Sequence, residues 1–114
     1  MKSWGLLVAL VVPLTGCATR TLYSWGHYEP LIYTMYANPG KATPEAQVTQ
    51  LEEDFQKAKA SNKPVPPGFH AHLGYLYYQL GKKDQARQEF ETEKASFPES
   101  AVFMDRMLAN LNKQ

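Results

Sequence analysis

The segment that most constrains the fold runs from Pro67 to Ser100 and carries small and bulky residues at fixed intervals. Gly81 divides it into two stretches of helical length, and Pro98, which cannot continue a helix, stands near its end. Gly74 and Ala86 are small, as residues must be where two helices approach closely. The residues expected to fill the space between the helices are Leu73, Tyr77 and Phe90. The segment therefore predicts a helical hairpin.

The order Leu-Gly, Tyr, Gly, Ala, Phe and Pro at these offsets resembles the tetratricopeptide repeat, a helix-turn-helix unit of roughly 34 residues. Two positions depart from the family pattern. His70 stands where a bulky apolar residue is usual, and Glu93 stands where alanine is usual. We therefore expect the second helix to be loosely covered at Glu93. An unrelated small helical bundle is the alternative, because such arrays usually need about three repeats.

The chain before this unit predicts two more helices. The first begins at Pro30 and ends at the turn residues 38–40. The second has Thr43 as its N-cap, Pro44 in its first position, and continues to about Ala60. Its apolar stripe resembles that of the second helix of the repeat. The stripe consists of Val48, Leu51, Phe55 and Ala58. These two helices are interpreted as a degenerate first repeat.

The end of such an array needs a capping helix, which we predict over residues 99–112. Its expected apolar face consists of Val102, Phe103, Met107, Leu108 and Leu111. The fold class is thus predicted to be all-α: tetratricopeptide-like hairpins and a C-terminal cap in one domain, residues 29–114.

The N-terminal residues 1–16 have the layout of a secretory signal peptide. Lys2 supplies a positive charge, an uncharged apolar run extends from Trp4 to Leu14, and Thr15 and Gly16 are small. The apolar run is shorter than the ~20 residues that a membrane-spanning helix needs. We expect this segment to be removed on export.

Cys17, the only cysteine, follows this run directly. The stretch Leu14-Thr15-Gly16-Cys17 resembles the lipobox of bacterial lipoproteins. The resemblance implies cleavage before Cys17, a diacylglycerol on its thiol and an acyl chain on its amine; no other cofactor is expected. Ala18 in place of aspartate implies, by the same resemblance, transfer to the outer membrane, facing the periplasm. The alternative is an exported cysteine that follows a signal sequence by accident.

Residues 17–28 are interpreted as the lipidated N-terminus and a short tether. In this stretch Leu22, Tyr23 and Trp25 have two possible places. They could rest at the lipid headgroups, where amphipathic aromatic residues settle, or pack on the first helix.

The charge balance argues against nucleic acid as a partner. The chain carries twelve basic and eleven acidic side chains, and loss of Lys2 with the leader would leave eleven of each. A nucleic-acid-binding surface usually requires a basic excess.

No residue pattern suggests an enzyme. The one thiol is predicted to be acylated, and no serine stands in a nucleophile-elbow context. His70 and His72 lie about 200° apart around a helix, so they do not chelate one metal, and we expect one to face the core and one the surface. A small-ligand or metal carrier is the weakest alternative.

Binding is the better prediction. In tetratricopeptide proteins the first helix of each unit lines a concave surface, which by resemblance is lined here by Gly68, Ala71, Tyr75, Tyr78 and Gln79. Tyr33 and Tyr36 could extend this surface. Tyrosines are enriched in interface hot spots. The alternative is that these tyrosines pack on the first hairpin as core.

Over nearly the whole chain, the lipobox, the stretch YSWGHYEP and the C-terminal unit resemble a family of small proteobacterial lipoproteins of unknown function. These are typically encoded beside a CsgG-like lipoprotein, which implies an envelope assembly partner. The predicted function is a lipid-anchored adaptor in an envelope lipoprotein assembly. The alternative is a regulator of a peptidoglycan synthase or hydrolase.

Overall fold

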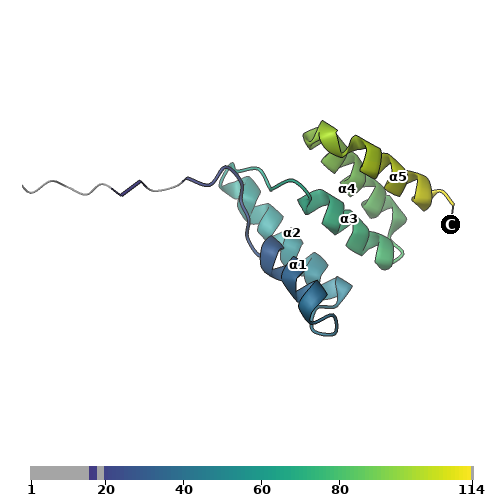
Figure 1. Ribbon diagram of the computed structural model, residues 1–114, viewed down its shortest axis with the longest axis horizontal. Coiled ribbons are helices and arrows are strands. Elements are labelled where there is room, and N and C mark those ends of the chain that lie inside the picture. The colour runs from purple at the N-terminus through teal and green to yellow at the C-terminus, as the bar shows by residue number, and fades with distance from the viewer. Residues whose placement is uncertain (1–15, 18–19, 114) are drawn as a thin grey trace, which may run out of the picture.

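The computed structural model describes residues 16–17 and 20–113, and within these residues all regular structure is helical (Figure 1). The predicted all-α class is confirmed. The signal peptide predicted for residues 1–16 lies outside the described residues except for Gly16. The helices are α1 (Tyr28–Ala37), α2 (Pro44–Ala60), α3 (Phe69–Gln79), α4 (Lys83–Ser96) and α5 (Ala101–Leu111), with a 3₁₀ turn, η1 (Pro98–Ser100), before α5.

Local signals set the start of α2 and the turn that follows α3. The Thr43 hydroxyl accepts a hydrogen bond from the Ala46 N–H (3.2 Å) and so caps α2, as predicted. Gly81, with a φ of +72°, makes the turn between α3 and α4. Helix α1 begins at Tyr28, two residues before the predicted Pro30. Proline is tolerated there because the first four N–H groups of a helix have no partner within it.

Helices α3 and α4 form the predicted hairpin and pack closely at Gly74. A Cβ atom at Gly74 would lie 2.7 Å from two carbons of the Phe90 ring. Phe90, Ala86 and Leu73 are at most 2% exposed. The small residue therefore lets the ring lie against the backbone of α3.

The hairpin forms the centre of the core, and α2 and α5 cover it on either side. Helix α2 contributes Leu51 and Ala58, which are fully buried, and Val48. Helix α5 contributes Met104, Leu108 and Leu111.

The predicted apolar face of α5 is partly wrong. Val102 and Phe103 are 78% and 57% exposed, whereas Met104 is 1% exposed. Met104, Leu108 and Leu111 are spaced by four and three residues and form one stripe. At about 100° per residue, Val102 lies about 200° from Met104 and points away from α4.

Glu93 is buried, so the prediction that α4 is loosely covered there is wrong. Its side chain is 2% exposed, and its carboxylate accepts hydrogen bonds from the N–H groups of Gly68 (2.7 Å) and Ala71 (3.3 Å). Gly68 has no side chain that could cap α3. The carboxylate from α4 satisfies the free N–H groups instead and is favoured by the positive end of the helix dipole.

The end of the predicted tether is part of the folded domain. The Ser24 N–H donates to the Pro64 carbonyl (2.8 Å), and the His27 N–H donates to the Asp54 carboxylate (2.7 Å). Gly26 has a φ of +48°, and a Cβ atom there would lie 2.6 Å from the Asp54 carboxylate. The free part of the tether therefore ends before about residue 23.

The aromatic residues of this segment contact the domain. Tyr23 meets Phe97 edge to face with ring centroids 6.3 Å apart, and Trp25 stacks on Tyr28 at 6.4 Å. Leu22, by contrast, is 81% exposed. Packing on the domain is thus found for Tyr23 and Trp25.

A candidate partner-binding groove

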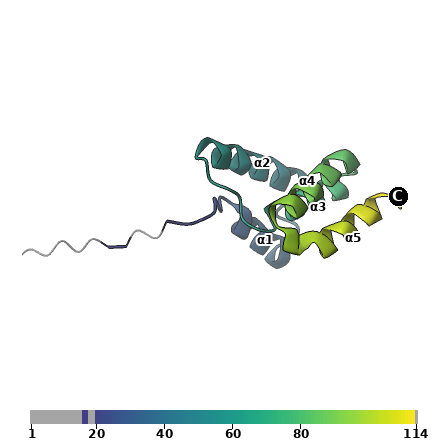
Figure 2. The same cartoon turned by 90° about the horizontal axis from the view of Figure 1, so that it is seen from above.

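Helices α1, α3 and α5 together border one face of the molecule. Figure 2 shows α1 and α5 on one side and α2 on the other, with α3 between them. Such an arrangement is expected when hairpins stack in the same orientation, because each hairpin then presents its first helix to the same side. The concave surface predicted from the repeat is therefore bounded by α1, α3 and α5.

This surface contains a groove of about 560 Å³. No Asp, Glu, Lys or Arg side chain is among the described residues that line it. Most of its wall is aromatic or sulfur-containing. The lining residues are Tyr28, Ile32, Met35 and Tyr36 from α1, Gly68, Ala71, His72, Tyr75 and Gln79 from the start and body of α3, Phe90 from α4, and Phe103 and Met107 from α5.

A second hollow of about 470 Å³ adjoins the groove along α1. The two share Tyr28, Ile32 and Tyr36, and the second adds Trp25, Glu29 and Tyr33. Together they form one surface, which we call the aromatic surface. Its exposed rings include Tyr36 (78% exposed), Tyr33 (71%) and Phe103 (57%).

The structure brings most of the predicted binding residues together. Ala71, Tyr75, Gln79 and Tyr36 line the groove, and Tyr33 lines the adjoining hollow. The Gln79 side chain donates a hydrogen bond to the Tyr75 hydroxyl (3.3 Å). Tyr78 does not line the groove; it is half-buried and packs against the core.

Sequence reasoning missed the contribution of α5. The sequence pattern predicts Phe103 on the buried face of α5, yet it forms an exposed wall of the groove. The signal was available: Met104, Leu108 and Leu111 already make a complete helical stripe, which leaves Phe103 without a place in it. Met35 and Met107 were also not predicted as groove residues.

The chain matches a known family over most of its folded domain. Residues 22–107, three quarters of the chain, match the family model described as a domain of unknown function, DUF4810. The chain belongs to the DUF4810 family. The matched range starts beside the docked segment and ends at Met107, so the DUF4810 domain includes every residue of the groove. The comparisons found no similar curated protein and no similar solved structure.

Both histidines of α3 are buried in the DUF4810 domain, so the prediction of one core and one surface histidine is wrong. His70 and His72 are 6% and 8% exposed. His70 pairs through Nδ1 with the Glu89 carboxylate (2.6 Å), and His72 Nε2 bonds to the Gln47 amide oxygen (3.0 Å). Within residues 16–17 and 20–113, no group of three or more His, Cys, Asp or Glu side chains could hold a metal.

The Gln47 amide determines which ring nitrogen of His72 carries the proton. Its nitrogen donates to the Ala42 carbonyl (3.1 Å), so its oxygen faces His72, and His72 donates from Nε2. Burial disfavours the charged imidazolium and lowers the pKa of His72 to about 4.

We expect the stability of the DUF4810 domain to fall between about pH 6.5 and pH 4. In this window the unfolded chain binds a proton at His72 that the folded protein does not, so the free energy of unfolding decreases as the pH falls. From the pKa of about 4, the loss reaches up to about 3 kcal/mol. Urea unfolding at pH 7 and pH 4.5 measures it. In the His72→Gln variant the free energy of unfolding should depend less on pH. An unchanged pH dependence would contradict the prediction.

Cys17 is exposed at the described end of the N-terminal segment. None of the described helices is long and apolar enough to cross a membrane.

Proposed function

We propose that this protein is a lipid-anchored, non-catalytic adaptor at the periplasmic face of the outer membrane, and that the aromatic surface binds another envelope protein. The uncharged groove between α1, α3 and α5 is the observation that carries the proposal. Large apolar side chains that stay exposed in one patch typically mark an interaction site.

The lining of the groove suits a protein segment with apolar side chains. Tyrosine and phenylalanine rings offer large, rigid contact areas and are common anchors of binding energy. Met35 and Met107 have flexible side chains that can adapt to an irregular partner. A charged substrate would find no opposite charge among the described residues of the groove.

The anchor restricts which partners can reach the groove. From Cys17 to Tyr23 the chain spans six residues, or about 20 Å when extended, so an acylated Cys17 keeps the domain close to the membrane. A second lipoprotein lies within this reach. The resemblance described above suggests a CsgG-like lipoprotein; a peptidoglycan synthase or hydrolase would need a domain near the outer membrane.

A photoreactive residue in place of Tyr75 or Phe103, activated in native membranes, tests the proposal. Both positions face the groove and are exposed, so the substitutions should not disturb the fold. The matched control is Glu91, which is exposed on α4. We expect adducts with an envelope lipoprotein from the groove positions and not from Glu91.

The other outcomes separate the alternatives. An adduct with a peptidoglycan synthase or hydrolase would replace the adaptor by the regulator, and no specific adduct from either groove position would reject the binding surface. With the partner purified, Tyr75→Ala and Phe103→Ala should each weaken binding at least about tenfold, as expected of hot-spot residues.

A further inference from the structure

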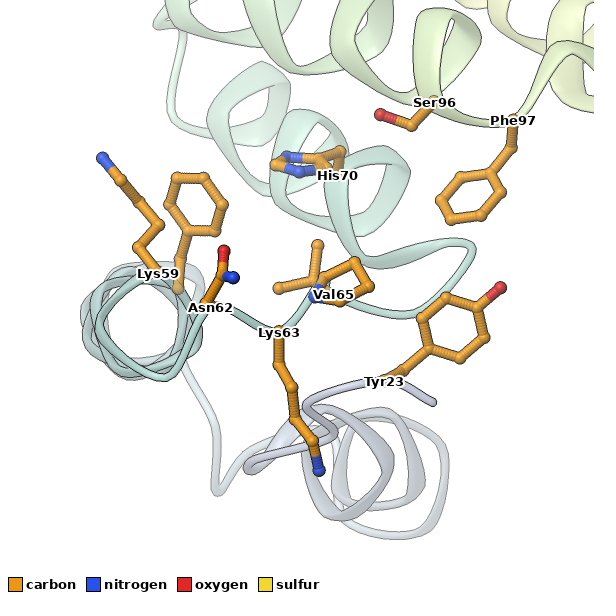
Figure 3. Close-up of a pocket in the computed structure, with 10 residues that line it drawn as sticks. Tyr23, Lys59, Asn62, Lys63, Val65, His70, Ser96 and Phe97 are labelled. Carbon is orange, nitrogen blue, oxygen red and sulfur yellow. The ribbon is translucent and has the colours of Figure 1, made fainter. Parts of the chain in front are cut away.

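A second pocket, of about 630 Å³, lies where the N-terminal segment joins the domain. Its walls come from the N-terminal segment, the end of α2, the α2–α3 loop, α3 and the end of α4. Figure 3 shows Tyr23 and Phe97 on one side of the pocket, Lys59 and Asn62 on the other, and Lys63 extending toward the N-terminal segment. This pocket lies outside the aromatic surface and shares no residue with it.

The pocket is positively charged and polar at its rim. Lys59 and Lys63 line it, together with Asn62 and Ser96, and no carboxylate is among the described lining residues. Both lysines are exposed, and neither forms an ion pair within the described chain. The nearby acid Glu89 is bonded to His70 Nδ1 and does not line the pocket. The charge of this rim complements an anion.

The aromatic walls add an amphipathic character. Lys59 Nζ lies 5.5 Å from the centroid of the Phe55 ring, and Tyr23 and Phe97 contact each other across the opposite wall. Lysines beside tyrosine and phenylalanine rings are typical of surfaces that meet lipid headgroups, because the rings sit at the interface while the amines contact phosphates.

The pocket lies close to the predicted anchor. Lys63 Nζ donates a hydrogen bond to the Thr21 hydroxyl (3.1 Å), so the positive charge of Lys63 lies beside the segment that leads to Cys17. Only three residues separate Thr21 from Cys17, so the two Cα atoms lie at most about 14 Å apart when the chain is extended. A lipid on Cys17, as proposed above, would bring the pocket to the headgroup layer.

We propose that this pocket binds the phosphate headgroup of an anionic phospholipid of the leaflet that holds the anchor. The contact orients the domain: the end that carries the α2–α3 loop faces the membrane, and the far end of the hairpin points away from it (Figure 1). The orientation of the domain on the membrane rests on the proposed anchorage at Cys17. The contact between the lysines and the phosphate does not itself require the acyl chains.

The test uses a chain that begins at position 17 and carries Cys17→Ala, so that it has neither the predicted leader nor a lipid, and vesicles of phosphatidylcholine with or without phosphatidylglycerol. We expect binding that depends on phosphatidylglycerol and falls about 30-fold in the double variant Lys59→Gln/Lys63→Gln, because each lysine near an anionic surface contributes about fivefold. The matched control is Lys41→Gln/Lys113→Gln. It removes the same charge from exposed positions and should bind like the parent.

Three results would overturn the proposal: equal binding to both kinds of vesicle, an equal loss in the control variant, or displacement from the vesicles by inorganic phosphate at matched ionic strength. The last result would identify a free phosphate as the ligand. Because the protein is not acylated and the aromatic surface is intact in every variant, failure here is distinguishable from failure of the proposed adaptor function.

Discussion

Replacement of Cys17 by alanine is expected to move the protein from the membrane fraction to the soluble fraction and to leave its fold intact. A single acyl chain binds membranes only marginally at about 0.8 kcal/mol per buried CH₂, but two or three chains add up to stable anchoring. Cys17 is exposed and lies outside the helices, so the domain should melt at an unchanged temperature. Membrane fractionation and thermal unfolding measure the two effects.

The control for this result is Ala18→Asp, which keeps the cysteine. By resemblance to enterobacterial lipoproteins, aspartate at this position should retain the protein in the inner membrane, so it stays anchored but changes membrane. Intact-mass measurement of the wild-type protein should show the mass of a diacylglycerol and an acyl chain on a chain that begins at Cys17. A wild-type mass without acyl chains would refute the anchor.

Gly74→Leu is expected to destabilise the domain by about 1–3 kcal/mol, as overpacking of a well-filled core does. The reason is the position of the Phe90 ring, 2.7 Å from where a Cβ atom would lie. Phe90 is 1% exposed in the centre of the core and has little room to move. For a domain of this size, the melting temperature should fall by about 4–8 °C per kcal/mol.

Gly40→Leu is the matched control for Gly74→Leu. Gly40 lies in the exposed turn between α1 and α2, and no atom lies within 4 Å of a Cβ atom there. Urea unfolding of both variants separates the clash from the general effect of adding a leucine. Equal losses of stability would show that the packing of Phe90 on Gly74 is not what makes glycine necessary.

The α3–α4 hairpin could be predicted because its determinants are close in sequence. Gly81 and Pro98 act on their own backbone, and the small Gly74 meets Phe90 across a short turn. The groove could be predicted in part for the same reason: Ala71, Tyr75 and Gln79 share one face of a single helix, whatever packs around it.

The errors at Glu93 and His72 share one cause: the hydrogen-bond partners of both residues lie far along the chain. The sequence near Glu93 offers no partner for its carboxylate, whereas the fold brings the N–H groups of Gly68 and Ala71 to it. One of the two histidines of α3 is expected at the surface, but His72 bonds to Gln47 of α2 in the interior and His70 is buried as well.

The sequence by itself determined the helices, their turns, and the position of Cys17 relative to the domain, because capping, helix breaking and motif spacing depend on near neighbours. Only the tertiary structure decided which faces are buried. It buried Glu93 and His72 beside distant partners, and it placed Lys63 beside the segment that leads to Cys17. Burial and charge pairing depend on how the helices stack, because stacking joins residues that are distant in sequence.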